Sequence, residues 1–123
     1  MIENIGIDNI EISRIVKAYE KHNYFADRIL TPAELLVFSK LSGKKKYEYL
    51  AGRWAAKEAF SKAYGTGIGP ISFQDMEILN NENGAPYFKK SPFKEGKTFI
   101  SISHSNQEAV AMVILERVKG NEK

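Results

Sequence analysis

The most constraining feature of this sequence is the segment 46–64, which predicts one long α-helix. It is rich in Ala, Glu and Lys, which favour helix, and Gly65 follows it as a typical helix end. The chain has 123 residues, which is the size of one domain. We therefore expect a single domain over residues 1–123, in which the other elements pack on this helix.

Further elements are expected before the long helix. The isoleucine-rich residues 1–12 predict a strand, and Ser13 is a candidate cap for a helix over about residues 14–22. Thr31 can cap the next helix, with Glu34 completing a capping box. That helix should end before the Ser-Gly pair that precedes a run of lysines.

The second half of the chain changes to strand patterns. Apolar residues predict strands over about residues 71–79, 85–88, 98–103 and 109–116. Residues 80–84, rich in Asn and Gly, predict a hairpin turn. Helices grouped first and antiparallel strands later predict the α+β class, with an antiparallel sheet packed on the long helix.

Composition excludes several classes of protein. Hydrophobic residues make up 43% of the chain, which is enough for a core, and no apolar run approaches the ~20 residues that span a bilayer. The absence of cysteine excludes disulfide scaffolds, thiol catalysis, zinc fingers and iron–sulfur clusters. The N-terminus lacks the basic region and apolar core of a signal peptide, so we expect a soluble, cytoplasmic protein.

Positive charge is concentrated in one segment. The net charge is +3, but residues 40–62 contain seven basic and two acidic side chains, whereas the rest of the chain contains 11 and 13. Such a local surplus suggests a site for phosphates or acidic surfaces. A lysine run such as Lys44-Lys45-Lys46 is usually a solvated loop, and it gains weight here because it leads into the long helix.

Glu58 and Lys62 are the first candidates for chemistry. They are four residues apart, so they share one helix face with Trp54, Ala55 and Ser61. Exposed ion pairs at this spacing are common and contribute only about 0.3–0.5 kcal/mol, and the pair alone favours that explanation. The small and aromatic residues around the pair favour instead a partner or a ligand.

Asp8 is the second candidate. It follows Gly6 in a strand with a core pattern, and glycine lets another backbone or a ligand approach closely. A carboxylate there could join a second one in holding a magnesium ion through oxygen ligands. An aspartate at a strand end more often belongs to a turn, and spacing alone does not show that Asp8 and Glu58 are close.

Two further segments could contact an anion. Residues 65–70 contain three glycines, whose backbone N–H groups could approach a phosphate, although Gly65 also serves as a helix cap. The segment matches neither a Walker loop nor a dinucleotide fingerprint. His104 follows a strand and could bind phosphate or assist a proton transfer, although a lone strand-end histidine is more often structural.

The N-terminal helix region has a basic and partly apolar surface, formed by Arg14, Lys17, Lys21, Phe25 and Arg28. This surface is either an ordinary solvated helix face or a docking site for an acidic partner protein. It precedes the basic segment 40–62, so the two are separate in sequence.

Taken together, these motifs resemble the holo-acyl carrier protein synthase family of phosphopantetheinyl transferases. The most specific part is Trp-Ala-Ala-Lys-Glu-Ala-Phe-Ser-Lys over residues 54–62, combined with Gly-Ile-Asp over residues 6–8. The resemblance covers nearly the whole chain and includes residues 28–31, 50–53, 65–67, 72–73 and 101–105. Enzymes of this family move the 4′-phosphopantetheine arm of coenzyme A onto a serine of apo-acyl carrier protein for fatty acid biosynthesis, and release adenosine 3′,5′-bisphosphate.

The resemblance implies a role for each candidate. Asp8 and Glu58 would hold a magnesium ion that bridges the pyrophosphate of coenzyme A, and Lys62 would neutralise phosphate charge and act on the leaving-group proton. The acceptor of the serine proton stays open between a metal-bound water and a carboxylate. The coenzyme-binding positions implied are Lys44, Lys45, Arg53, Ser61, Lys62, Gly65, Thr66 and His104.

The resemblance also implies partners. The small bacterial type of this family is a homotrimer with active sites between subunits, and its carrier protein would meet Arg14, Lys21, Phe25 and Arg28 here. Asn9 stands where the family usually has an aliphatic residue, and strand alternation places it with Ile5 and Ile7.

Two other functions are compatible with parts of the sequence. A small basic nucleic-acid-binding module belongs to another class, but the charge is local and no RNA-binding motif is recognisable. A transferase for peptide- or polyketide-synthase carriers is a closer alternative. Those enzymes are typically pseudo-dimers of about twice this length, so chain length favours the small trimeric type.

Overall fold

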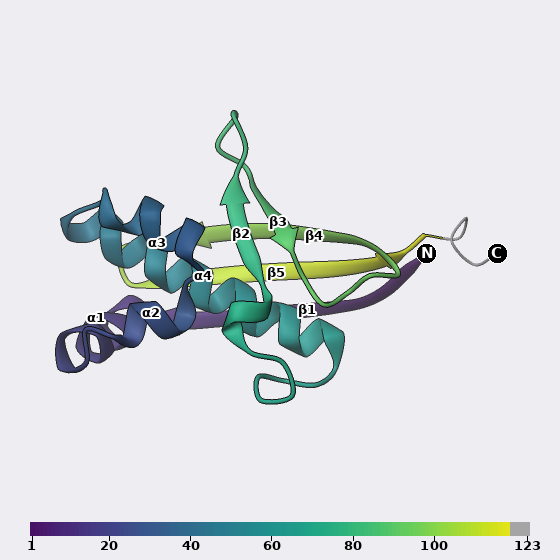
Figure 1. Cartoon of the computed structure of the whole chain (residues 1–123), viewed down its shortest axis with the longest axis horizontal. Coiled ribbons are helices and arrows are strands. Elements are labelled where there is room, and N and C mark those ends of the chain that lie inside the picture. Colours follow the sequence, from purple (N-terminus) through teal and green to yellow (C-terminus); the bar gives the residue numbers. More distant parts are fainter. Residues whose placement is uncertain (119–123) are drawn as a thin grey trace.

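The structure, a computed structural model that describes residues 1–118, is organised around the helix α4 (Gly43–Tyr64) (Figure 1). Its larger sheet is antiparallel with the strand order β1 (Ile2–Glu11), β5 (Glu108–Arg117), β4 (Gly96–His104), so the first and last strands of the chain are neighbours. The predicted α+β class, with an antiparallel sheet packed on the long helix, is confirmed. A single domain over residues 1–123 stays a prediction.

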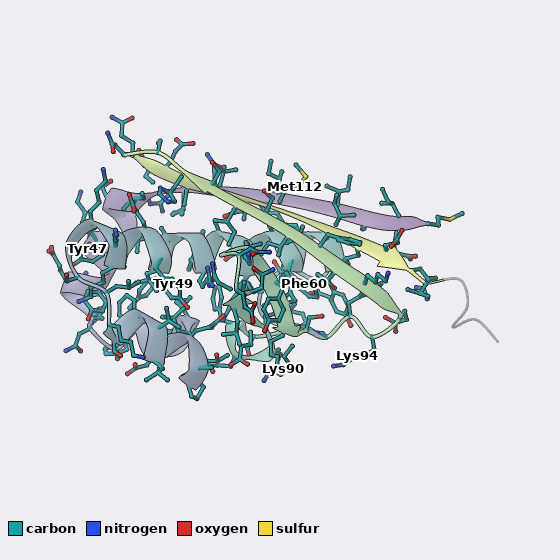
Figure 2. All side chains as sticks on the ribbon, turned by 90° about the horizontal axis from the view of Figure 1, so that it is seen from above. Tyr47, Tyr49, Phe60, Lys90, Lys94 and Met112 are labelled. Carbon is teal, nitrogen blue, oxygen red and sulfur yellow. The ribbon has the colours of Figure 1, made fainter. Side chains whose placement is uncertain are left out.

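α4 packs on one face of the larger sheet, chiefly against β1 and β5. The contact uses small side chains of the helix, and Ala55 and Ala59 are fully buried together with Val113 of β5. Alternation along β5 places Met112 on the opposite face, where its side chain points away from α4 (Figure 2). The sheet therefore has one core face and one face that remains exposed in the single chain.

β1 lies very close to α4 at Gly6. A Cβ atom at this position would lie 2.0 Å from the Ala59 carbonyl oxygen and 2.7 Å from the Ala63 amide nitrogen. The close approach expected at Gly6 is thus confirmed, and the approaching backbone is that of α4. Asp8 is two residues further along the strand and faces the same side, so this contact brings its carboxylate to the helix.

The other elements lie around α4 (Figure 1). The short helices α1 (Ile12–Lys21), α2 (Phe25–Ile29) and α3 (Pro32–Ser39) gather beside its N-terminal half. A separate hairpin of β2 (Glu77–Asn80) and β3 (Pro86–Lys90) confirms the turn predicted between them. No helix within residues 1–118 has both the length and the apolar character to cross a membrane.

A buried ion pair ties α3, β2 and α4 together. Lys57 Nζ lies 2.6 Å from Glu34 Oε1, and both side chains are fully buried. Glu34 also accepts hydrogen bonds from the backbone N–H groups of Thr31 (2.8 Å) and Ile78 (2.7 Å), while Lys57 donates to the Ile29 carbonyl (2.7 Å). Burial lowers the pKa of Lys57, and the Glu34 charge opposes this. The capping box predicted at Thr31 is confirmed, but its glutamate has this second role, which the sequence did not indicate.

Two local predictions are wrong, and one short helix was not predicted. Ser13 lies inside α1 rather than capping it, because the helix begins at Ile12, whose N–H donates to the Gln107 carbonyl at 2.8 Å. The strand predicted over residues 71–79 begins instead with a 3₁₀ helix, η1 (Phe73–Asp75), because the Asp75 carboxylate accepts from the Ser72 N–H at 2.9 Å. The short helix α2 was not expected at all.

Gly6→Ala is expected to destabilise the protein, because the new methyl group would overlap the backbone of α4. Overpacking of this kind typically costs about 1–3 kcal/mol, and a helix backbone cannot rotate away as a side chain can. Urea unfolding followed by circular dichroism measures the free energy of unfolding.

Gly52→Ala is the matched control for this measurement. A Cβ atom there would meet only the Ile102 Cγ2 methyl, at 3.2 Å, and alanine favours helix over glycine. Equal free energies of unfolding for the two variants would contradict the importance of the close contact at Gly6.

Candidate functional site

The first candidate site lies where β1 crosses α4. Lys62 Nζ lies 2.8 Å from Asp8 Oδ1 and donates to the Ile7 carbonyl at 3.2 Å. Lys62 thus reaches across to β1 rather than forming an ion pair within the helix with Glu58, as its spacing alone would favour. Asp8, Glu58 and Lys62, which the sequence could not place together, form one cluster.

The two carboxylates of this cluster are partly withdrawn from water. The Asp8 side chain is 13% exposed, and its second oxygen, Oδ2, is buried without a hydrogen-bond partner in the structure. Burial and the neighbouring Asp8 carboxylate raise the pKa of Glu58, and Lys62 lowers it. A cation close to both carboxylates would offset their repulsion and could bind the unpaired Asp8 Oδ2.

A hard divalent cation fits this arrangement. Magnesium prefers oxygen ligands and is typically bound through one or two carboxylates plus water and substrate phosphates. Within residues 1–118 no group of three or more His, Cys, Asp or Glu side chains gathers as a metal centre. Asp8 and Glu58 could therefore hold a magnesium ion only if water or a phosphate-bearing ligand supplies the remaining oxygens.

A second candidate site is a groove of about 490 Å³ beside the first half of α4. One wall is the helix, and the others are the β2–β3 hairpin and the end of β4. His104 lies at the end of β4, with Nδ1 3.5 Å from the Glu48 carboxylate of α4. The residues that line the groove are Leu41, Lys45, Glu48, Tyr49, Gly52, Arg53, Asn80, Gly84, Pro86, Ile102 and His104.

The side chains predicted to contact the coenzyme differ in their exposure and in the hydrogen bonds they already form. Lys45 is exposed in the groove, while Lys44 is hydrogen-bonded to the Asn106 side chain. Arg53 is only 5% exposed, and its guanidinium stacks on Tyr49, donates to the Ile78 carbonyl at 3.2 Å and is hydrogen-bonded to Asn80. Arg53 therefore builds the wall of the groove as well as charging it.

The end of α4 supplies the remaining predicted contacts. Gly65 ends the helix in the left-handed conformation with φ 94°, as expected from its position. The Ser61 hydroxyl is buried and donates to the Glu58 carbonyl at 2.7 Å, and Thr66 Oγ1 donates to the Gly67 carbonyl at 2.8 Å. The turn thus has a fixed backbone just beyond Lys62, on the same end of α4 as the carboxylate cluster.

The basic surplus of residues 40–62 is not one surface. Lys57 forms the buried ion pair with Glu34. Lys46 Nζ lies 4.5 Å from the ring centroid of Tyr19 and 5.4 Å from that of Phe38. Lys62 belongs to the Asp8 cluster, Lys45 lines the groove, and Lys44 is hydrogen-bonded to Asn106. Within residues 1–118, α4 thus presents no continuous basic stripe, which weakens the nucleic-acid alternative.

The predicted docking surface borders an apolar groove. Arg14, Lys21 and Arg28 are exposed on α1 and α2. Phe25 and Arg28 line a hollow of about 460 Å³, which also contains Trp54 stacked against Phe73 at a ring distance of 6.5 Å. The other residues lining it are Ile29, Ile68, Gly69, Ile71, Ser72 and Gln74.

Glu48 and Tyr49 are groove residues that the sequence did not single out. Glu48 is one of the two acidic residues in the basic segment 40–62. Its helical spacing from Lys45 and Gly52, three and four residues away, was the available indication that it shares their face. Tyr49 lies four residues before Arg53, and this spacing was the available indication of their contact, in which the guanidinium lies 4.4 Å from the ring centroid.

Comparisons with known proteins place these sites in a family. The sequence model described as "4′-phosphopantetheinyl transferase superfamily" matches residues 4–114. The chain is 60% identical over 116 residues to a holo-[acyl-carrier-protein] synthase of Streptococcus sanguinis, covering 94% of this chain and 96% of the relative. It is 56% identical over 119 residues to one of Streptococcus thermophilus, covering 97% and 99%.

Solved structures agree with this. One neighbour is a holo-(acyl-carrier-protein) synthase of Bacillus anthracis in complex with CoA (3′,5′-ADP), with a TM-score of 0.89, 49% identity, and coverage of 96% of this chain and 99% of that one. Another is the synthase of Helicobacter pylori in complex with coenzyme A, with a TM-score of 0.79, 35% identity and coverage of 89% and 96%. The fold and the family resemblance are thereby confirmed.

Glu58→Gln is expected to raise the stability of the metal-free protein at pH 7. A raised pKa means that ionised Glu58 disfavours the folded state, and the amide removes this penalty. The gain should decrease as the pH falls through the raised pKa and vanish below the ordinary value of 4.5, where Glu58 is neutral in both states.

Thermal unfolding with a metal chelator, from pH 4 to pH 8, checks this. Glu82→Gln, in the exposed turn between β2 and β3, is the control and should give no such pH-dependent gain. A Glu58→Gln variant that is less stable than the parent across this range would contradict the proposed electrostatic strain.

Proposed function

The chain belongs to the 4′-phosphopantetheinyl transferase superfamily, and we propose that Asp8, Glu58 and Lys62 carry the chemistry of its reaction. The reaction transfers 4′-phosphopantetheine from coenzyme A to a serine of apo-acyl carrier protein, a step that serves fatty acid biosynthesis. The observation that supports the assignment of residues is the cluster itself, in which a buried orphan carboxylate oxygen, a second carboxylate and a lysine meet.

The reaction breaks and forms one bond at phosphorus. The serine hydroxyl loses its proton to a water molecule or a carboxylate and its oxygen attacks the β-phosphorus of coenzyme A, while the bond to the bridging oxygen breaks and adenosine 3′,5′-bisphosphate leaves. Magnesium, when bound by Asp8 and Glu58, would neutralise the charge on the pyrophosphate as a Lewis acid. Lys62, whose ammonium is exposed on one side, would donate to the oxygen that becomes free on the leaving group.

The rigid end of α4 would bind the pyrophosphate next to this cluster. Gly65 and Thr66 come three and four residues after Lys62, and the Ser61 hydroxyl donates to the Glu58 carbonyl in the last turn. Coenzyme A would then extend along the helix toward the groove, where Lys44, Lys45, Arg53 and His104 would meet its other phosphate. The cytoplasmic location expected from the sequence is part of this proposal.

The carrier protein would dock on α1 and α2. Arg14, Lys21 and Arg28 present positive charge there, and Phe25 with Trp54 supplies an apolar hollow beside it. Charges at the rim would steer an acidic partner, and the hollow would accept an apolar side chain. Trp54 lies one helical turn before Glu58, so a carrier bound here would bring its serine to the cluster.

We also propose that three copies assemble through the outer face of the larger sheet. Ile5, Ile7, Phe99 and Met112 lie on this face, and each is between 41% and 55% exposed, which is unusual for large apolar side chains arranged together. Asn9 is exposed on the same face, as strand alternation predicted. A trimer would cover this surface and place sites between subunits.

Sedimentation equilibrium tests the assembly. The protein is expected to have three times its monomer mass, and Ile7→Lys, which buries a charge in the interface, is expected to yield monomers. A matched Lys89→Ala change, at an exposed position of β3 outside the larger sheet, should not alter the mass. A monomeric parent protein would contradict the proposed trimer.

Mass spectrometry of the carrier protein tests the reaction. Apo-acyl carrier protein incubated with this protein, coenzyme A and magnesium is expected to gain one phosphopantetheine on a serine. Glu58→Gln is expected to lower the rate by about 100-fold or more, because one of the two carboxylates that would hold magnesium is lost. Glu82→Gln is the control and should stay active. Near-full activity of Glu58→Gln in saturating magnesium would contradict the role of Glu58.

A further inference from the structure

Glu48 is an unexpected residue in a groove that would bind a polyanion. Its side chain is only 15% exposed, and its carboxylate lies 3.5 Å from His104 Nδ1. A largely buried carboxylate should repel a phosphate, so its presence beside Lys45 and Arg53 requires a reason. The contact with His104 supplies one.

The contact decides which protonation state of His104 can bind a phosphate. An ionised carboxylate only accepts hydrogen bonds, so the imidazole nitrogen that faces it, Nδ1, carries the hydrogen. In a neutral ring Nε2 then has a lone pair and repels a phosphate oxygen. Nε2 becomes a donor only when the ring takes up a second proton and is positively charged.

Among the described residues of the groove, no other group can account for the uptake of this proton near neutral pH. The other titratable groups that face it come from α4 and are Lys45, Tyr49 and Arg53. Burial raises the pKa of Tyr49 from its ordinary value of 10.0, so it stays neutral, and although burial lowers the pKa of Arg53, a guanidinium keeps its charge near neutral pH. The hairpin wall offers Asn80, Gly84 and Pro86, which do not titrate.

The position of the groove indicates which phosphate is involved. Ten residues separate Glu48 from Glu58, so the two lie about 15 Å apart along the helix axis. The cluster of Asp8 and Glu58 is where the pyrophosphate would bind, and a phosphate near His104 must then be a different one. In coenzyme A this is the 3′-phosphate of the ribose.

We propose that Glu48 is a positioning residue that makes His104 bind the 3′-phosphate of coenzyme A only as an imidazolium, so that coenzyme binding takes up a proton. This inference rests on the proposed function, because it needs coenzyme A in the groove. Glu48 makes no contact with the reacting atoms. It acts by fixing the ring and its hydrogen.

Calorimetry of coenzyme A binding tests the inference. The binding enthalpy, measured with magnesium at pH 7.5 in buffers of different ionisation enthalpy, gives the number of protons taken up. The parent protein is expected to take up protons, and Glu48→Gln roughly half as many or fewer, because a glutamine can donate to Nδ1 and leave Nε2–H on a neutral ring. His104→Gln should behave in the same way, and it carries the test if Glu48→Gln does not fold.

Two controls separate this role from a merely structural one. Lys45→Gln removes a permanent charge from the same groove, so it should weaken binding without changing proton uptake. Dephospho-coenzyme A, which lacks the 3′-phosphate, should bind the parent protein without the additional uptake. The inference would be overturned if proton uptake were unchanged in Glu48→Gln or His104→Gln, or complete with dephospho-coenzyme A. A parent protein that does not bind coenzyme A at all would overturn the proposed function as well.

Discussion

The contact of β1 with the backbone of α4 at Gly6 determines where the proposed catalytic cluster lies. No side chain fits between the strand and the helix there, since an added Cβ would lie 2.0 Å from a carbonyl oxygen of α4. The strand therefore runs close to the helix, and Asp8 reaches Lys62 and the neighbourhood of Glu58. Without this contact, the two carboxylates would belong to separate surfaces.

The opposite side of α4 is fixed by the buried pair of Glu34 and Lys57. Removing one partner of such a pair commonly costs about 3–5 kcal/mol, because the other charge is left buried and unpaired. Glu34 also accepts from the Ile78 N–H, and Arg53 donates to the Ile78 carbonyl, so the same network sets the hairpin against α4. One helix thereby positions the carboxylate cluster, the groove and the hairpin wall.

The sequence predicted local features well and distant contacts poorly. The cap at Thr31, the end of α4 at Gly65 and the close approach at Gly6 were predictable, because each depends on neighbouring residues and backbone conformation. The proximity of Asp8 to Lys62 is set by how β1 crosses α4, and the spacing of the two residues along the chain does not predict it. Lys57 shows the same limit, since its charge suggested a phosphate contact and only the fold reveals its buried partner.

Binding of manganese(II) in the presence of coenzyme A, followed by electron paramagnetic resonance, tests most directly whether Asp8 and Glu58 hold a divalent cation together. The parent protein is expected to bind the ion, and Asp8→Asn and Glu58→Gln are each expected to weaken binding by about 10- to 100-fold or more. Loss of a residue that only supports a metal ligand typically has an effect of this size, and loss of the ligand itself should have at least the same effect. Manganese binding of unchanged affinity in both variants would contradict the shared site.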